Sequence, residues 1–141
     1  MSQNHLLIVH SDPSVRALMT SMLQTMGHRI DEAPNDRAAV RMLEQGKADL
    51  VLAGADPGDP EALEFLIYLR RKHPRTPVIL LFETPHPERA REAALRGAAA
   101  VLKFPLPATQ LRAAVAQVLG VPDPAGGGAA PPAPRPSRAV G

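Results

Sequence analysis

Side chains able to bind a metal ion or a phosphoryl group follow three short apolar runs of the sequence. Carboxylate oxygens hold divalent cations, and an ammonium group or a hydroxyl binds phosphoryl oxygens. Such groups meet in an open α/β sheet, because ligands lie outside the carboxyl ends of its strands. The candidates at this sheet edge are His10, Ser11, Asp12, Asp56, Asp59 and Lys103.

The segment from Ala48 to Pro60 contains the central apolar run, Leu50–Ala53, which is bounded by Gly46-Lys47 and by a Gly/Asp/Pro cluster. This pattern is typical of a strand buried on both faces in the middle of a parallel sheet. We therefore expect the loop from Gly54 to Pro60 to line any functional site.

Five apolar strand segments alternate with five helical segments along the rest of the chain. This alternation predicts an α/β fold with a doubly wound, five-stranded parallel sheet and right-handed crossovers. Asp12 and Pro13 are suited to begin the first helix, and Gly27 to end it. Its apolar stripe, expected to face the sheet, consists of Val15, Leu18, Met19, Met22, Leu23 and Met26.

The composition excludes several classes of protein. The chain has 141 residues and no cysteine, which indicates one domain without disulfides or thiolate metal sites. No signal peptide or membrane-spanning run is present, so we expect a cytoplasmic protein that does not contact the membrane. Aromatic residues make up 3%, which leaves no stacking platform for nucleic acid, and we expect no nucleic-acid partner.

The composition changes abruptly after Gly120. Proline, alanine and glycine dominate residues 121–141, which have almost nothing to bury. We predict a folded domain over residues 1–120 and a disordered tail over residues 121–141. The tail is interpreted as a linker or a plain terminus, with a docking segment as the alternative.

Several motifs together resemble the receiver domain of bacterial response regulators, from Leu6 to Leu119. They are Leu-Leu-Ile-Val-x-x-Asp-Pro-Ser-Val-Arg, Ala-Asp-Leu-Val-Leu, Leu-Glu-Phe-Leu-x-x-Leu-Arg, Thr-Pro-Val-Ile-Leu-Leu and Ala-Leu-Arg-Gly-Ala-Ala-Ala-Val-Leu-x-x-Pro. The resemblance implies a flavodoxin-like receiver fold. It also implies an activity, the self-phosphorylation of an aspartate at the end of the third strand. In the family an acidic pair holds Mg²⁺, and a Ser or Thr and a Lys bind the phosphoryl oxygens.

The chain departs from the family's pattern at each of these positions. The acidic pair falls on His10 and Ser11, and the phosphorylated aspartate falls on Gly54. The hydroxyl position is Phe82, and the lysine position is Phe104, with Lys103 one residue early. Neighbouring strand residues point to opposite faces, so Lys103 does not simply replace the lysine. The aromatic switch position on the fifth strand is Val101.

Two interpretations of the remaining polar residues stay open. In the first, a rewired site uses His10, Asp12, Asp56, Asp59 and Lys103. In the second, Asp12 is a helix cap, Asp56 and Asp59 form turns, and His10 is a polar strand-end residue. We favour the second interpretation. The remnant of a phosphorylation pocket is then formed by His10, Ser11, Asp12, Gly54, Asp56, Phe82, Lys103 and Phe104.

The sequence therefore predicts a pseudo-receiver, a phosphorylation-independent adaptor domain that binds proteins in bacterial signal transduction. We expect no enzymatic activity, no catalytic residue, no metal and no cofactor. Phe82 and Phe104 are expected to fill part of the vacated pocket with apolar contacts. The alternative is a receiver whose remodelled pocket at the carboxyl end of the sheet binds a small molecule.

Two surfaces are candidates for binding a protein partner or a second copy of the chain. Ile67 and Tyr68 lie at or beyond the edge of the helical arc that covers the sheet, beside Arg70 and Arg71. Aromatic and arginine residues commonly anchor such contacts. The second candidate surface contains Arg89, Glu92, Val101 and Arg112.

Overall fold

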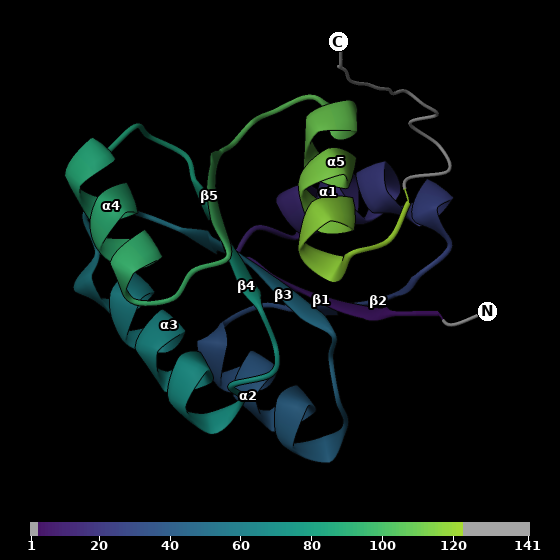
Figure 1. Cartoon of the computed structure of the whole chain (residues 1–141), viewed down its shortest axis with the longest axis horizontal. Helices are drawn as coiled ribbons and strands as arrows, with labels where there is room; N and C mark the ends of the chain where they lie inside the picture. The colour runs from purple at the N-terminus through teal and green to yellow at the C-terminus, as the bar shows by residue number, and fades with distance from the viewer. Residues whose placement is uncertain (1–2, 123–141) are drawn as a thin grey trace, which may run out of the picture.

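The computed structural model describes residues 3–122 and contains one five-stranded parallel sheet with the strand order β2-β1-β3-β4-β5. This arrangement confirms the doubly wound fold predicted from the sequence (Figure 1). The strands are β1 (His5–Val9), β2 (Arg29–Ala33), β3 (Leu50–Ala55), β4 (Val78–Phe82) and β5 (Ala100–Lys103).

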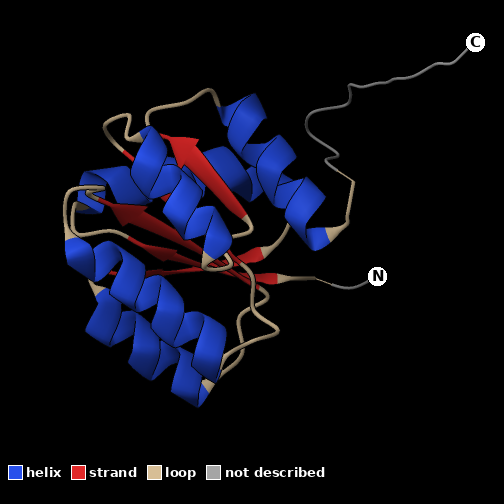
Figure 2. Cartoon of the chain, turned by 60° about the vertical axis from the view of Figure 1, so that its left-hand side comes forward, coloured by secondary structure: helices blue, strands red, loops and turns tan. Residues whose placement is uncertain are grey.

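Helices cover both faces of this sheet. Helices α1 and α5 lie on one face, and α2, α3 and α4 lie on the other (Figures 1 and 2). A 3₁₀ turn, Gln24–Met26, follows α1. The helices are α1 (Pro13–Leu23), α2 (Asp36–Gln45), α3 (Pro60–Lys72), α4 (Pro87–Leu95) and α5 (Ala108–Leu119).

Local sequence signals begin and end these helices. Asp12, Asn35 and Asp59 each accept a backbone N–H from the first turn of α1, α2 and α3, which satisfies a donor that the helix itself leaves free. Gly27 and Gly120 follow the last turns in the left-handed region, with φ of 81° and 70°, where glycine is favoured.

The apolar core is divided by the sheet into two clusters. Leu6 and Ile8 of β1 pack towards α1 and α5, and Leu7 and Val9 pack towards α2, α3 and α4. This alternation follows from the two-residue period of a strand. Every residue of β4 is buried, as expected for a strand covered by helices on both faces.

Two expectations about the elements need correction. Strand β3 continues through Gly54 and Ala55, which pair with Leu81 and Phe82 of β4, so the loop begins two residues later than expected. Leu18 does not face the sheet, and 46% of its surface is exposed. The buried face of α1 is narrower than the predicted apolar stripe, and Met19 and Leu23 are its buried residues.

The carboxyl end of the described chain still contacts the domain. The N–H of Val121 donates to the carbonyl of Ala116 at 3.0 Å, and its side chain packs against the α1/α5 cluster. Most of the predicted tail, residues 123–141, lies outside the described residues. Within residues 3–122, no helix has the length and apolar character needed to cross a membrane.

Candidate functional site

The imidazole of His10, at the end of β1, lies directly against Gly54 of β3. A Cβ atom placed on Gly54 would stand 2.1 Å from Cδ2 and 2.9 Å from Nε2 of His10, which is far closer than non-bonded atoms approach. The ring therefore occupies the space that a side chain at position 54 would need.

Two hydrogen bonds hold the His10 ring in this place. Its Nδ1 accepts the backbone N–H of Asp12 at 3.0 Å, and its Nε2 lies 3.1 Å from Oε2 of Glu83. Because Nδ1 is an acceptor here, the neutral ring carries its proton on Nε2 and donates it to the Glu83 carboxylate. The side chain of His10 is only 11% exposed. His10 thus bridges the end of β1 and the segment after β4.

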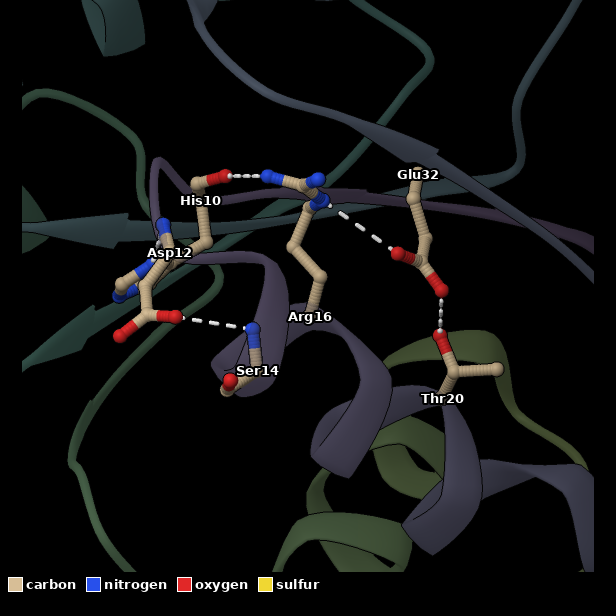
Figure 3. A network of polar contacts seen from close by, with 6 residues as sticks. All are labelled: His10, Asp12, Ser14, Arg16, Thr20 and Glu32. Carbon is tan, nitrogen blue, oxygen red and sulfur yellow. Dashed lines mark hydrogen bonds and ion pairs between the residues drawn. The ribbon is translucent and has the colours of Figure 1, made fainter.

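A second polar network fixes the loop that follows β1. Nη1 of Arg16 donates to the carbonyl oxygen of His10 at 2.6 Å, while its Nε donates to Glu32 at 3.3 Å (Figure 3). The hydroxyl of Thr20 donates to the other carboxylate oxygen of Glu32 at 2.7 Å. Arg16 and Glu32 therefore tie the His10 backbone to α1 and β2.

A cavity of about 630 Å³ opens next to His10 and Gly54, between the first turns of α2 and α3. Val9, Ala53 and Leu80 form its apolar floor. The volume lies within the range of pockets that hold small ligands, roughly 300–1,000 Å³.

The rim of this cavity is acidic. It carries Asp36 from α2 together with Asp56, Asp59 and Glu61 around the start of α3. The pKa of Asp36 is raised, mainly because its carboxyl group is partly removed from water and to a lesser degree because the carboxylates of Glu61 and Asp59 lie nearby. Nowhere in residues 3–122 do three or more His, Cys, Asp or Glu side chains come together in a way that could hold a metal ion.

The remaining aspartates near the site serve the local backbone. Asp12 accepts the N–H of Ser14 at 2.8 Å as the cap of α1 (Figure 3), and Asp56 accepts the N–H of Gly58 at 2.9 Å in a turn. These bonds are the cap and turn roles favoured from the sequence.

Phe82 and Phe104 are both buried, but they do not share one volume. Phe82 packs on the α2/α3/α4 face, whereas Phe104 packs on the α1/α5 face. The expectation that the two rings fill one vacated pocket therefore needs correction. Lys103 pairs in register with Phe82 at the end of β5, and its side chain is exposed to solvent.

The structure thus brings part of the predicted site together. The cavity is lined by His10, Ser11, Gly54 and Asp56, while Asp12, Phe82, Lys103 and Phe104 do not line it. Residues 6–116, which include this whole sheet edge, match the family model of the response regulator receiver domain. The chain belongs to this family.

Individual relatives agree with the assignment. The response regulator protein PilR of Pseudomonas aeruginosa is 30% identical over 124 residues, a match that covers 88% of this chain and 28% of PilR. A response regulator from Thermotoga maritima has a TM-score of 0.80 at 20% identity, with 84% of this chain and 99% of that structure covered. NtrX from Brucella abortus in complex with ADP has a TM-score of 0.77 at 23% identity, and the match covers 84% of this chain and 26% of the NtrX chain. At these identities the two structures support the fold alone.

The predicted partner residues of this receiver domain differ in how far they reach solvent. Ile67 and Tyr68 are half-buried, and Tyr68 packs against the α2/α3/α4 core. Arg70 donates to the carbonyls of Pro74 and Thr76 at 2.9 and 3.0 Å, so it holds the turn after α3. Arg71 is exposed.

The second candidate surface of this receiver domain is partly engaged with the domain itself. Arg89 and Glu92 form an ion pair at 3.7 Å on α4. Val101 packs partly against the core, and Arg112 of α5 donates to the carbonyl of Met22 at 3.5 Å.

Sequence reasoning missed Glu83, the partner of His10, and the contribution of Asp36 and Glu61 to the acidic rim. Glu83 directly follows the last residue of β4, so its position at the shared carboxyl edge was a usable signal. Asp36 and Glu61 stand in the first turns of α2 and α3, which meet at that edge.

Proposed function

We propose that this receiver domain works without phosphorylation, as a protein-binding domain in bacterial signal transduction. The observation that carries the proposal is the imidazole of His10 in the space that a phosphorylated side chain at position 54 would need. The domain then has no enzymatic activity and needs no metal or cofactor. Its place is the cytoplasm, with proteins rather than nucleic acid or membranes as partners.

The chemistry of the site supports the proposal. Transfer of a phosphoryl group to a receiver needs an acceptor carboxylate, a bound divalent cation and donors for the phosphoryl oxygens. Gly54 has no side chain, and His10 and Ser11 supply no carboxylate for the cation. Phe82 has no hydroxyl, and Lys103 points to solvent.

The His10 ring also leaves no place for the phosphoryl group, which is the ligand that shifts the conformation of a receiver domain. A ligand shifts a conformational equilibrium only by its difference in affinity for the two states. His10 connects β1 to the segment after β4 through Glu83 without any phosphoryl group. The domain accordingly keeps one conformation, and it presents the same surface to its partners without phosphorylation.

Mass spectrometry of the intact chain after incubation with acetyl phosphate and Mg²⁺ tests the proposal. We expect no phosphorylated species, while an intact receiver domain treated in parallel gains one phosphoryl group. A phosphorylated form of this chain would contradict the proposal, whichever residue carries the group.

The cavity beside His10 supports a second candidate function, the binding of a small molecule. Its volume of about 630 Å³ and its apolar floor with a polar rim are features of ligand pockets. A metabolite screen by thermal shift tests this function, because a ligand specific for the folded state raises the melting midpoint. Loss of the shift on replacing Leu80 in the floor with a larger side chain would place the ligand in this cavity.

A further inference from the structure

The two ends of the sheet carry opposite charge. At the carboxyl edge, seven exposed acidic residues stand against the three basic residues Arg37, Arg89 and Lys103. Arg16 and Glu32 pair with each other nearby and add no net charge. The seven acidic residues are Asp12, Asp36, Asp56, Asp59, Glu61, Glu83 and Glu88.

A basic surface lies at the opposite end of α3. Arg71 and Lys72 end this helix, and Arg75 follows in the turn between α3 and β4. All three side chains are exposed, and within residues 3–122 none of them forms an ion pair. We call Arg71, Lys72 and Arg75 the basic turn.

The basic turn has a fixed shape. Arg70 donates to the carbonyls of Pro74 and Thr76, and the hydroxyl of Thr76 donates to the carbonyl of Ala48 at 3.2 Å. The side chain of Arg70 also packs against Gly97, where an added Cβ would stand 3.2 Å from it. A turn whose backbone is fixed before binding has only its side chains left to order when it docks.

The charges of the acidic rim and of the basic turn cannot neutralise each other within one molecule. Helix α3 has 13 residues and so separates them by about 20 Å, whereas charges are largely screened beyond about 8 Å at physiological salt. The pKa of Asp36 is raised first by its partial removal from water and then by the neighbouring carboxylates of Glu61 and Asp59. Both charge sets are therefore available to another molecule.

The acidic rim and the basic turn lie at opposite ends of the same face of the domain. The acidic rim surrounds a hollow between the first turns of α2 and α3, which lie side by side on one face (Figures 1 and 2). The basic turn is a connection between α3 and β4 at the other end of the same face. A shift of one molecule along the strand direction brings the basic turn of one copy to the hollow of the next.

We propose that this chain self-associates head to tail, with the basic turn of one copy docked at the acidic rim of the next. Such a contact joins two different surfaces, so it produces open chains of molecules unless its rotation closes a ring. The proposal goes beyond the proposed function and does not depend on it, because it makes no use of position 54.

Sedimentation velocity of the full chain over a concentration series tests the proposal. At low salt we expect the weight-average sedimentation coefficient to rise with concentration, and at high salt to return to the monomer value, because exposed ion pairs are screened. A chain that stays monomeric at low salt at every concentration overturns the proposal, and so does association that high salt leaves unchanged.

Charge-reversal variants identify the two surfaces. One variant carries Arg71→Glu with Arg75→Glu, and the other carries Asp36→Lys with Glu61→Lys; circular dichroism checks that each folds. In each variant alone, the dissociation constant for self-association should rise by on the order of tenfold or more. An equimolar mixture should associate again, because the intact rim of one variant meets the intact basic turn of the other and the two reversed surfaces are also opposite in charge. Two variants that associate as the parent does, or a mixture that stays monomeric, overturn the proposal.

Two control variants change charges outside the basic turn and the acidic rim. Arg91→Glu changes an exposed charge on α4 away from the basic turn and should leave association unchanged. Arg135→Gln with Arg138→Gln removes the two arginines of the carboxyl-terminal segment and should also leave association unchanged. Loss of association in this second control would assign the acidic rim to that segment and overturn the proposal.

Discussion

His10 stands in the place of a side chain at position 54, with its Cδ2 only 2.1 Å from the point that a Cβ of residue 54 would occupy. The two residues lie at the ends of adjacent strands, where β1 pairs with β3. The backbone of Gly54 is not in the left-handed region, so space rather than backbone conformation excludes a side chain there.

This contact predicts a coupling between positions 10 and 54. Gly54→Ala should destabilise the domain by about 1–3 kcal/mol, because the new methyl group displaces a ring held by Asp12 and Glu83. In a His10→Ala background the same substitution should have almost no effect. Urea unfolding of the parent, both single variants and the double variant measures the coupling free energy. Equal effects of Gly54→Ala in both backgrounds would show that the ring moves aside without cost.

Restoring the acceptor alone should not restore phosphorylation. Gly54→Asp adds a carboxylate, but His10 crowds it, and neither His10 nor Ser11 supplies a ligand for Mg²⁺. Incubation with acetyl phosphate followed by intact mass measurement should show no added phosphoryl group. A matched variant combines Gly54→Asp with His10→Asp and Ser11→Asp, which removes the crowding ring and supplies the missing carboxylates for Mg²⁺. Phosphorylation of Gly54→Asp by itself would mean that the site is misassigned.

The acidic rim predicts a pH-dependent effect at Asp36. Its pKa is raised above the ordinary value of 3.8 by partial removal from water and by Glu61 and Asp59, so its charged form weakens the folded state. Asp36→Asn should therefore raise the melting midpoint at pH 7. The gain should shrink as the pH falls towards 3.8 and disappear below it, since the carboxyl is then protonated in both states.

Melting curves at pH 7 and pH 3 measure this difference. Glu64→Gln, an exposed position in the middle of α3, is the control and should give no such pattern. A gain for Asp36→Asn that is the same at both pH values would contradict the assignment to charge.

Tyr68 should contribute to folding as well as to any partner surface. Its ring packs against the α2/α3/α4 core, so Tyr68→Ala should reduce the free energy of unfolding by about 1–3 kcal/mol. Tyr68→Phe keeps the ring and should stay within about 0.5 kcal/mol of the parent. Denaturant unfolding compares the two variants, and an unchanged midpoint for Tyr68→Ala would place the ring in solvent. Tests of partner binding are therefore better made at Ile67 and Arg71.

The fold was predictable because local signals agree with one another. The caps at Asp12, Asn35 and Asp59 and the apolar strand runs all favour the same alternation of elements. The predicted ends of the elements differ from the structure by a few residues in places. Glycine at position 54 indicated the end of a strand, but pairing with Leu81 keeps it within β3.

The site was predictable in its missing groups and not in its contacts. Gly54 and Phe82 can be recognised as departures from sequence alone. The pairing of His10 with Glu83 joins residues 73 positions apart, and it depends on side-chain directions that only the folded chain defines. For the same reason the sequence could not separate Phe82 and Phe104 onto opposite faces of the sheet.

Amide spectra recorded during a titration with Mg²⁺ and beryllofluoride, which mimics a phosphoryl group on aspartate, test the central claim most directly. The amides of His10, Gly54 and Phe82 report on the end of each strand that surrounds the site. We expect their chemical shifts to stay unchanged at every concentration, because no carboxylate is present at position 54 and the imidazole fills its space. Saturable shifts of these three amides would contradict a receiver domain that works without phosphorylation.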